Sequence, residues 1–81
     1  MNDERLSRAN ALSEKLKTLR KKRAEIERLK HSERGLVLTD YDGGVKLNIL
    51  DNKSLENTIL VLIGTALDEI IKNTEKEYDE L

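Results

Sequence analysis

The chain contains no cysteine, proline, phenylalanine or tryptophan, and its single histidine is His31. Without cysteine it can form no disulfide and no cysteine-based zinc site, and one histidine cannot make a histidine-rich metal site. Without large aromatic side chains there is little to fill a core. A chain of 81 residues is marginal on its own, since it buries only about 60–65% of its unfolded surface. We therefore expect a homo-oligomer that uses no cofactor and no metal.

Charged side chains are abundant, at 38% of the residues, and the two halves of the chain carry opposite net charges. Residues 1–34 contain 11 Lys/Arg and 6 Asp/Glu, whereas residues 35–81 contain 4 Lys/Arg and 10 Asp/Glu. This asymmetry indicates either a polyanionic partner for the first half or attraction between the halves. The high charge and the absence of proline favour long helices or a coiled coil.

The chain has no long hydrophobic run. Its most apolar stretch, residues 59–67, is far shorter than the roughly 20 residues that span a bilayer. The first residues are polar and charged, unlike a signal peptide. Together with the lack of cysteine, this predicts a protein of the cytoplasm, in the host cell if the source is a phage, with no membrane partner.

The first third of the sequence predicts a helix over about residues 3–32. Its apolar residues recur at steps of three, four or seven, namely Leu6, Ala9, Leu12, Leu16, Leu19, Ile26 and Leu29. Asn2 or Asp3 is the expected N-cap, and Gly35 lies just beyond the expected end. Arg23 and Lys30 occupy positions where a coiled coil requires apolar groups, so the apolar seam is narrow.

Residues 35–50 predict a β-hairpin, because Asp42-Gly43 lies between two runs of alternating polarity. With these two residues as the loop, Tyr41 faces Gly44 and Leu38 faces Leu47. The register then places one set of apolar side chains on a single face of the hairpin, namely Leu36, Leu38, Val45, Leu47 and Ile49. A slip of one residue would destroy that agreement.

The last third predicts a second helix over about residues 54–80, capped by Asp51, Asn52 or Ser54. Its apolar face is wide, and every residue from 59 to 63 is apolar. Gly64 costs stability inside a helix, which close helix–helix approach would compensate. The expected oligomer core lies here, with candidates Ile59, Leu60, Leu62, Ile63, Gly64, Leu67, Ile70 and Ile71.

These elements predict a mainly α (α+β) fold, with one domain over residues 1–81. A helix of about 30 residues is about 45 Å long, too long for a globule with a radius of gyration of about 12 Å. The chain is therefore expected to form an elongated antiparallel helical hairpin. Copies would then pack their second helices together and extend their β-hairpins into a shared sheet or barrel.

Two short motifs suggest chemistry, and both have a simpler explanation. Residues 36–44 resemble the first motif of haloacid-dehalogenase-type phosphatases, in which two aspartates act beside magnesium. That resemblance implies roles for Asp40 and Asp42, but the chemistry needs a large α/β domain. The same region partly matches a calcium loop, yet Val45 stands where glycine is required. We expect Asp40 and Asp42 to be turn residues and the protein not to be an enzyme.

Seven residues are candidates for binding an anion or another ligand. Arg20, Lys21, Lys22 and Arg23 form a basic run that suits phosphates, although Glu25 and Glu27 follow it closely. Pairs such as Lys21/Glu25 and Arg23/Glu27 would weaken its field. Arg34, Tyr41 and Lys46 suit a nucleotide-like ligand at a subunit interface.

The order helix, Asp-Gly hairpin, helix resembles β-type prefoldin subunits, whose hairpins assemble into a shared barrel. It is also similar to small phage-encoded helix–hairpin–helix proteins, over residues 5–81. The second resemblance implies an accessory or anti-defence role, such as sequestering a signalling nucleotide or a host defence protein.

The sequence thus predicts a non-catalytic homo-oligomer that sequesters a ligand or partner. One alternative is a nucleic-acid-binding protein that uses its basic first helix. Another is a structural coiled-coil adaptor.

Overall fold

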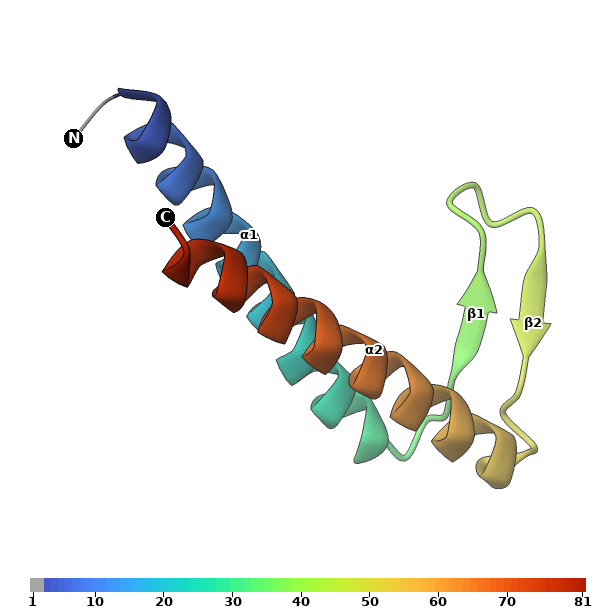
Figure 1. Ribbon diagram of the computed structural model, residues 1–81. Helices are drawn as coiled ribbons and strands as arrows, with labels where there is room; N and C mark the ends of the chain where they lie inside the picture. The colour runs from blue at the N-terminus through green and yellow to red at the C-terminus, as the bar shows by residue number, and fades with distance from the viewer. Residues whose placement is uncertain (1–2) are drawn as a thin grey trace.

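The computed structural model describes residues 3–81, which form two long antiparallel helices joined by a short β-hairpin (Figure 1). Helix α1 spans Asp3–Lys30, strands β1 and β2 span Val37–Thr39 and Lys46–Asn48, and helix α2 spans Lys53–Asp79. The radius of gyration is 16.6 Å and the extents are 54 × 25 × 15 Å. The expected elongated helix–hairpin–helix shape is confirmed. The start of α1 and the end of α2 lie at the same end of the helix pair (Figure 1).

Helix α1 packs against α2 through a stripe of aliphatic residues. The buried residues are Leu12, Leu16, Leu19 and Ile26, four members of the stripe that the sequence predicts. The helix ends at Lys30, two residues before the predicted limit, and the next residues turn, with the Ser32 N–H bonded to the Leu29 carbonyl at 3.1 Å. Of the two expected N-caps, Asn2 lies outside the described residues, and Asp3 is the first residue of the helix.

Gly35 lies between α1 and the hairpin in a conformation that suits only glycine. Its φ is +85°, in the left-handed region. A Cβ atom here would lie 2.6 Å from Leu50 Cδ2, so the Leu50 side chain would have to shift to admit one. Gly35, which the sequence predicts to end the first helix, therefore also lies where the segment that enters the hairpin passes close to Leu50 in the segment that leaves it.

The hairpin has the predicted register but a longer loop. Leu38 pairs with Leu47 and Thr39 with Lys46. The last backbone bond of the ladder runs from the Asp40 N–H to the Val45 carbonyl at 3.2 Å. Residues 41–44 therefore form a four-residue loop, so the predicted facing of Tyr41 and Gly44 is wrong. The Val45 N–H donates to the Asp40 carboxylate at 3.1 Å, and this side-chain contact closes the turn in place of a tighter loop.

Helix α2 begins with a side-chain cap, which the sequence anticipated. Asn52 Oδ1 accepts a hydrogen bond from the Leu55 N–H at 3.0 Å, and this contact satisfies one of the free N–H groups of the first turn. The buried residues of α2 are Glu56, Leu60, Gly64 and Thr74. The Thr74 hydroxyl donates to the Ile70 carbonyl at 2.7 Å, which satisfies this buried polar group within its own helix.

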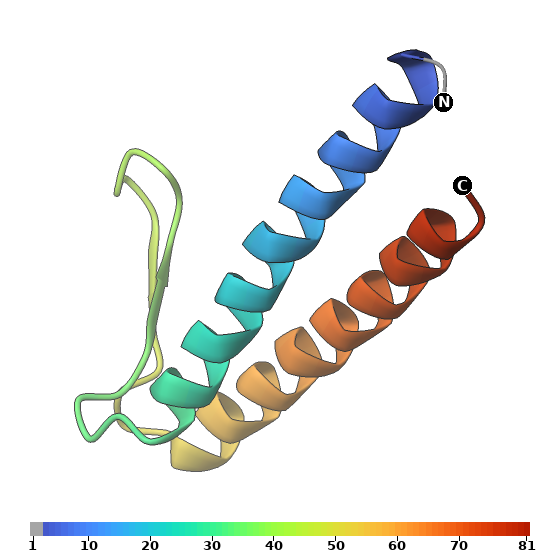
Figure 2. The ribbon, with the colours of Figure 1, turned by 90° about the vertical axis from the view of Figure 1, so that its left-hand side faces the viewer.

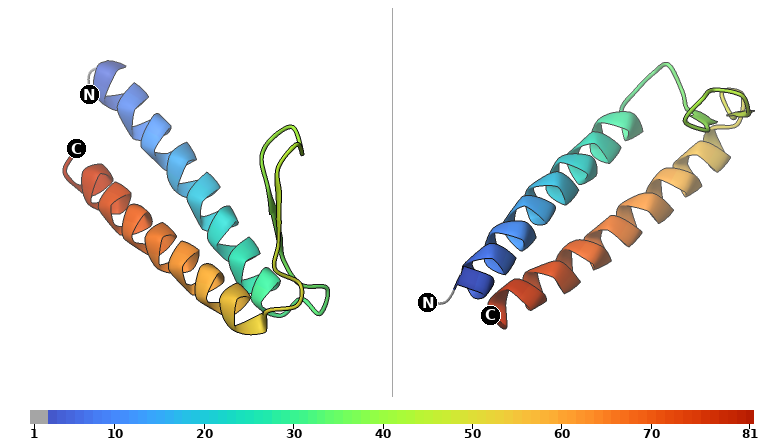
Figure 3. Two further views of the ribbon diagram at one scale, coloured as in Figure 1. Left: turned by 90° about the vertical axis from the view of Figure 1, so that its right-hand side faces the viewer. Right: turned by 90° about the horizontal axis from the view of Figure 1, so that it is seen from above.

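The hairpin stands away from the helix pair. Each strand packs against the other strand and against neither helix, and all six strand residues are exposed. Ile49, just after β2, is buried, so the hairpin is anchored at its base. Figures 2 and 3 show the tip of the hairpin diverging from the helices, and neither α1 nor α2 covers its faces.

Candidate functional site

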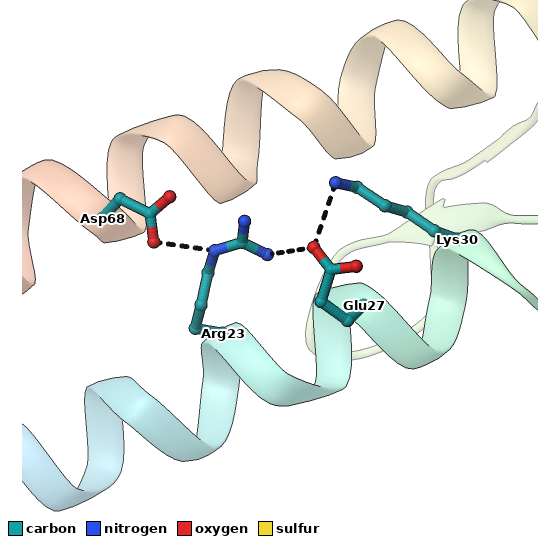
Figure 4. A network of polar contacts seen from close by, with 4 residues as sticks. All are labelled: Arg23, Glu27, Lys30 and Asp68. Atoms are coloured by element: carbon teal, nitrogen blue, oxygen red, sulfur yellow. Dashed lines mark hydrogen bonds and ion pairs between the residues drawn. The ribbon is translucent and has the colours of Figure 1, made fainter.

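A group of charged side chains joins α1 to α2 at the middle of the helix pair (Figure 4). Arg23 Nε lies 2.8 Å from Asp68 Oδ1 on α2, and Arg23 Nη1 lies 2.8 Å from Glu27 Oε1. Lys30 Nζ reaches the same Glu27 oxygen at 3.1 Å. A second pair between the helices joins Arg20 and Glu75 at 3.9 Å. The opposite charges of the two halves therefore attract each other within one chain.

These contacts shift two pKa values. The hydrogen bond from Arg23, followed by that from Lys30, lowers the pKa of Glu27. The hydrogen bonds to Asp68 and then Glu27 raise the pKa of Arg23. The guanidinium is therefore held as a cation by two carboxylates, so Arg23 is already occupied as an anion-binding group.

Gly64 provides the space in which the Arg23 guanidinium lies. A Cβ atom at position 64 would be 3.2 Å from Arg23 Cζ, closer than a relaxed contact. The sequence predicted close approach at Gly64, and the approaching group is the end of the Arg23 side chain. The two positions that looked unfavourable separately, a cation in an apolar seam and a glycine within a helix, accommodate each other.

The other predicted ligand residues do not gather into one site. Lys21 and Lys22 are exposed on α1, and neither makes an ion pair within residues 3–81, so the expected Lys21/Glu25 pair does not form. Arg34 lies in the connection after α1, and Lys46 lies on β2. Tyr41 is fully exposed, at 102%, in the hairpin loop.

The expected oligomer-core residues divide into two groups on α2. Leu60, which is 1% exposed, and Gly64 are buried against α1 of the same chain. Ile59, Leu67 and Ile71 are partly buried. Leu62 is 64% exposed, and Ile63 and Ile70 are also exposed. The members of this last group are the ones available to another copy.

Glu56 is a feature that the sequence did not reveal. Glu56 is 1% exposed, and its Oε2 atom is buried without a hydrogen-bond partner among residues 3–81. Its other oxygen lies 3.5 Å from Lys53 Nζ. The sequence suggests only a favourable charge at the start of α2, because burial of Glu56 depends on Gly35 and Leu50 crossing beside it.

The aspartates of the hairpin take the structural role expected of them. Asp40 accepts from Val45 N–H through its carboxylate and from Gly43 N–H through its carbonyl, at 3.1 Å in each case. Asp42 lies in the exposed loop. Within residues 3–81, no group of three or more His, Cys, Asp and Glu side chains has the arrangement of a metal site.

Three depressions on the surface of residues 3–81 are open to solvent. One depression of about 380 Å³ is lined by Glu25, Arg28, Leu29 and Ser32. Two others, of about 240 and 300 Å³, lie near the chain ends. Among the predicted ligand residues, Arg20 alone contributes to any of these three depressions.

Comparison of the chain with protein-family models, curated proteins and solved structures gives no match. The resemblances to prefoldin subunits and to small phage proteins therefore stay predictions. Within residues 3–81, neither helix combines the length and the apolar character needed to cross a membrane.

Proposed function

We propose that this protein is a non-catalytic binding protein that works as a homo-oligomer, assembled through the outer side of α2. The observation that carries the proposal is a second apolar stripe on this helix, which we call the outer stripe. It consists of residues spaced four, three, four and four apart, namely Leu55, Ile59, Leu62, Ala66 and Ile70. On a helix this spacing forms one face, and it is a different face from the one buried against α1.

The outer stripe is larger than the scattered apolar exposure of an ordinary surface. Four of its five members are exposed, and the exposed residues Val61 and Ile63 lie beside it. Contiguous apolar patches of this kind mark interaction surfaces. Packing of two such helices together would remove both stripes from water, and it would supply the core that a chain of this size lacks.

The same proposal locates ligand binding between copies. The single chain offers shallow depressions and scattered polar candidates. Arg34, Tyr41 and Lys46 all lie in or beside the hairpin, at the end of the molecule where neighbouring copies would meet. A nucleotide-like ligand or a host protein held there would fit a sequestering role, including the anti-defence role that the resemblance implies.

Sedimentation of a matched pair of variants tests the assembly. Leu62→Glu places a charge in the outer stripe, whereas Thr65→Glu places the same charge at an exposed polar position of the same helix. We expect the wild type and Thr65→Glu to sediment as oligomers and Leu62→Glu as a folded monomer, with helix content checked by circular dichroism. A monomeric wild type at micromolar concentration would contradict the proposal.

Native mass spectrometry of the wild-type oligomer tests ligand binding. It shows whether a small molecule accompanies the oligomer, since a purely structural adaptor would carry none.

Nucleic-acid binding by α1 is a second candidate, favoured by the exposure of Lys21 and Lys22 without ion pairs in the described chain. It predicts an affinity for a duplex that falls steeply with salt. The test is fluorescence anisotropy of Lys21→Ala/Lys22→Ala, with Lys72→Ala/Lys76→Ala as the control that removes the same charge from α2. Arg23 is unsuitable for this test because it bonds to Asp68 and Glu27. Equal binding by the two double variants would reject α1 as the interface.

A further inference from the structure

The outer edge of strand β1 is open. Both strands of the hairpin pack only against each other, and the exposed side chains of β1 include Val37 and Leu38. In Figure 2 the two strands overlap beside the helix pair, and neither helix lies over them. A two-stranded sheet with both edges free is marginal in water, and free edges are sites at which another strand can add.

The hydrogen bonds of the hairpin determine which backbone groups of β1 are free. Asp40 pairs with Val45 through its N–H, and Leu36 accepts from the Ile49 N–H at 3.4 Å. Bonded and non-bonded pairs alternate along an antiparallel ladder, so Leu38 and Leu47 form the bonded pair between them. The N–H and C=O groups of Val37 and Thr39 therefore point away from β2, toward the open edge.

The two edges of the hairpin differ in how well they suit another strand. On β2 the outward backbone groups belong to Lys46 and Asn48, and lysine on an edge strand opposes edge-to-edge pairing. The Asn48 side chain is also occupied by the Leu50 N–H, at 2.9 Å. The sequence of β1 is Val-Leu-Thr, which carries no charge and has high strand propensity.

We propose that β1 pairs with β1 of a second copy across a twofold axis that passes between the two Leu38 residues. This inference rests on the proposed homo-oligomer and names the edge and register of its hairpin contact. Val37 of each copy then bonds to Thr39 of the other, and their outward N–H and C=O groups satisfy one another. The four strands form one sheet in the order β2-β1-β1-β2, and Leu38 and Leu47 of both copies make a continuous apolar row across it.

Cysteine cross-linking tests the register, and the absence of native cysteine makes the experiment clean. In the proposed pairing the two Leu38 residues are a non-bonded pair with Cα atoms about 4.5 Å apart, which a disulfide can bridge. Leu38→Cys under mild oxidation is expected to run as a disulfide-linked dimer. Leu47→Cys is the matched control, since it is the cross-strand partner of Leu38 on the same face but lies one strand further from the axis. Tyr41→Cys, at the fully exposed loop, measures random collision.

Each outcome has one meaning. A Leu38→Cys dimer formed faster than that of Tyr41→Cys, with Leu47→Cys remaining monomeric, supports the pairing. Faster cross-linking of Leu47→Cys would show that β2 forms the edge contact and would overturn the inference, as would cross-linking of Leu38→Cys no faster than collision. If Leu38→Cys fails while sedimentation still shows an oligomer, the β1 contact is wrong and the α2 contact stands. If the wild type sediments as a monomer, both the β1 contact and the α2 contact are wrong.

Thr39→Pro provides a second test that needs no cysteine. The Thr39 N–H points outward and makes no bond within the hairpin, so proline would remove the edge donor without removing a bond to β2. We expect this variant to sediment at a lower mass than the wild type at the same concentration. Lys46→Pro is the matched control, because Lys46 is the cross-strand partner of Thr39 and its N–H points outward from the opposite edge. An unchanged mass for Thr39→Pro would contradict pairing through β1.

Discussion

Helices α1 and α2 have nearly the same length, 28 and 27 residues, but they differ in the apolar surface that they leave in water. The exposed large aliphatic residues of α1 are Leu6 and Leu29, which lie apart near its two ends, whereas those of α2 form a contiguous stripe. In α1 the leucines and isoleucine of the central stripe are buried, and most of the remaining surface is charged or polar. In α2 one face is buried against α1, while the outer stripe faces water.

This difference shows which helix has an apolar face left over for another molecule. A helix needs one apolar face to pack against one neighbour, and α1 has one such face. The additional face of α2 has no partner within residues 3–81, and its residues have the size and spacing of a helix–helix interface. The first helix therefore serves to stabilise the chain, and we infer that the second serves both the chain and the assembly.

The largest expected effect distinguishes the two faces of α2. Leu60→Ala removes a side chain that is 1% exposed, and it should lower the free energy of unfolding by about 2–5 kcal/mol at every protein concentration. Leu62→Ala should lower it only at concentrations where the chain associates, since isolated surface changes usually stay within about 0.5 kcal/mol. Urea denaturation at several protein concentrations measures both. Equal losses that do not depend on concentration would remove the distinction between the faces.

A smaller effect tests how α1 and α2 meet at Gly64. Alanine improves helix propensity over glycine by about 1 kcal/mol, but here its Cβ would press on the Arg23 guanidinium. We expect Gly64→Ala to stabilise an Arg23→Ala background by about that amount and to stabilise the wild type by less. A double-mutant cycle from denaturation curves gives the coupling. Full additivity of the two substitutions would show that Arg23 does not occupy this space.

The smallest effect is the pH dependence of the ion group on α1. The pKa of Glu27 is lowered from its ordinary value of 4.5 by hydrogen bonds from Arg23 and Lys30, so its contribution to stability is present above that pH. It should be lost as the pH falls through the lowered pKa. The difference in Tm between the wild type and Glu27→Gln should therefore shrink on acidification below about 4.5, and it should be smaller in high salt. Glu25→Gln, at a position without an ion pair in the described chain, should show no such change.

Periodicity made much of the fold predictable. The spacing of Leu12, Leu16 and Leu19 fixed the buried side of α1, and the alternation around Leu38 and Leu47 fixed the register of the hairpin. The loop was harder to predict, because the same strand pairing is compatible with a two-residue or a four-residue loop. The four-residue loop forms here because the Val45 N–H bonds to the Asp40 side chain. Local sequence rules favour Asp-Gly as a two-residue loop and do not include that side-chain contact.

The division of α2 into two faces was less accessible to sequence reasoning. When all residues from 59 to 63 are apolar, periodicity shows that the helix is covered on several sides but not which side faces α1. In the structure the side that carries Gly64 faces α1, where Arg23 occupies the space beside Gly64 and bonds to the carboxylate of Asp68. The burial of Glu56 depends on residues that are distant along the chain.

The contact between Arg23 and Gly64 also sets the axial alignment of the two helices. If α2 were displaced by one heptad, Asn57 or Ile71 would lie where Gly64 now leaves room for the guanidinium. Asp68 would move by about 10 Å, beyond the reach of Arg23. A leucine seam alone would tolerate such sliding, because its repeats are alike. Any exchange of α2 between copies would therefore have to reproduce this one alignment.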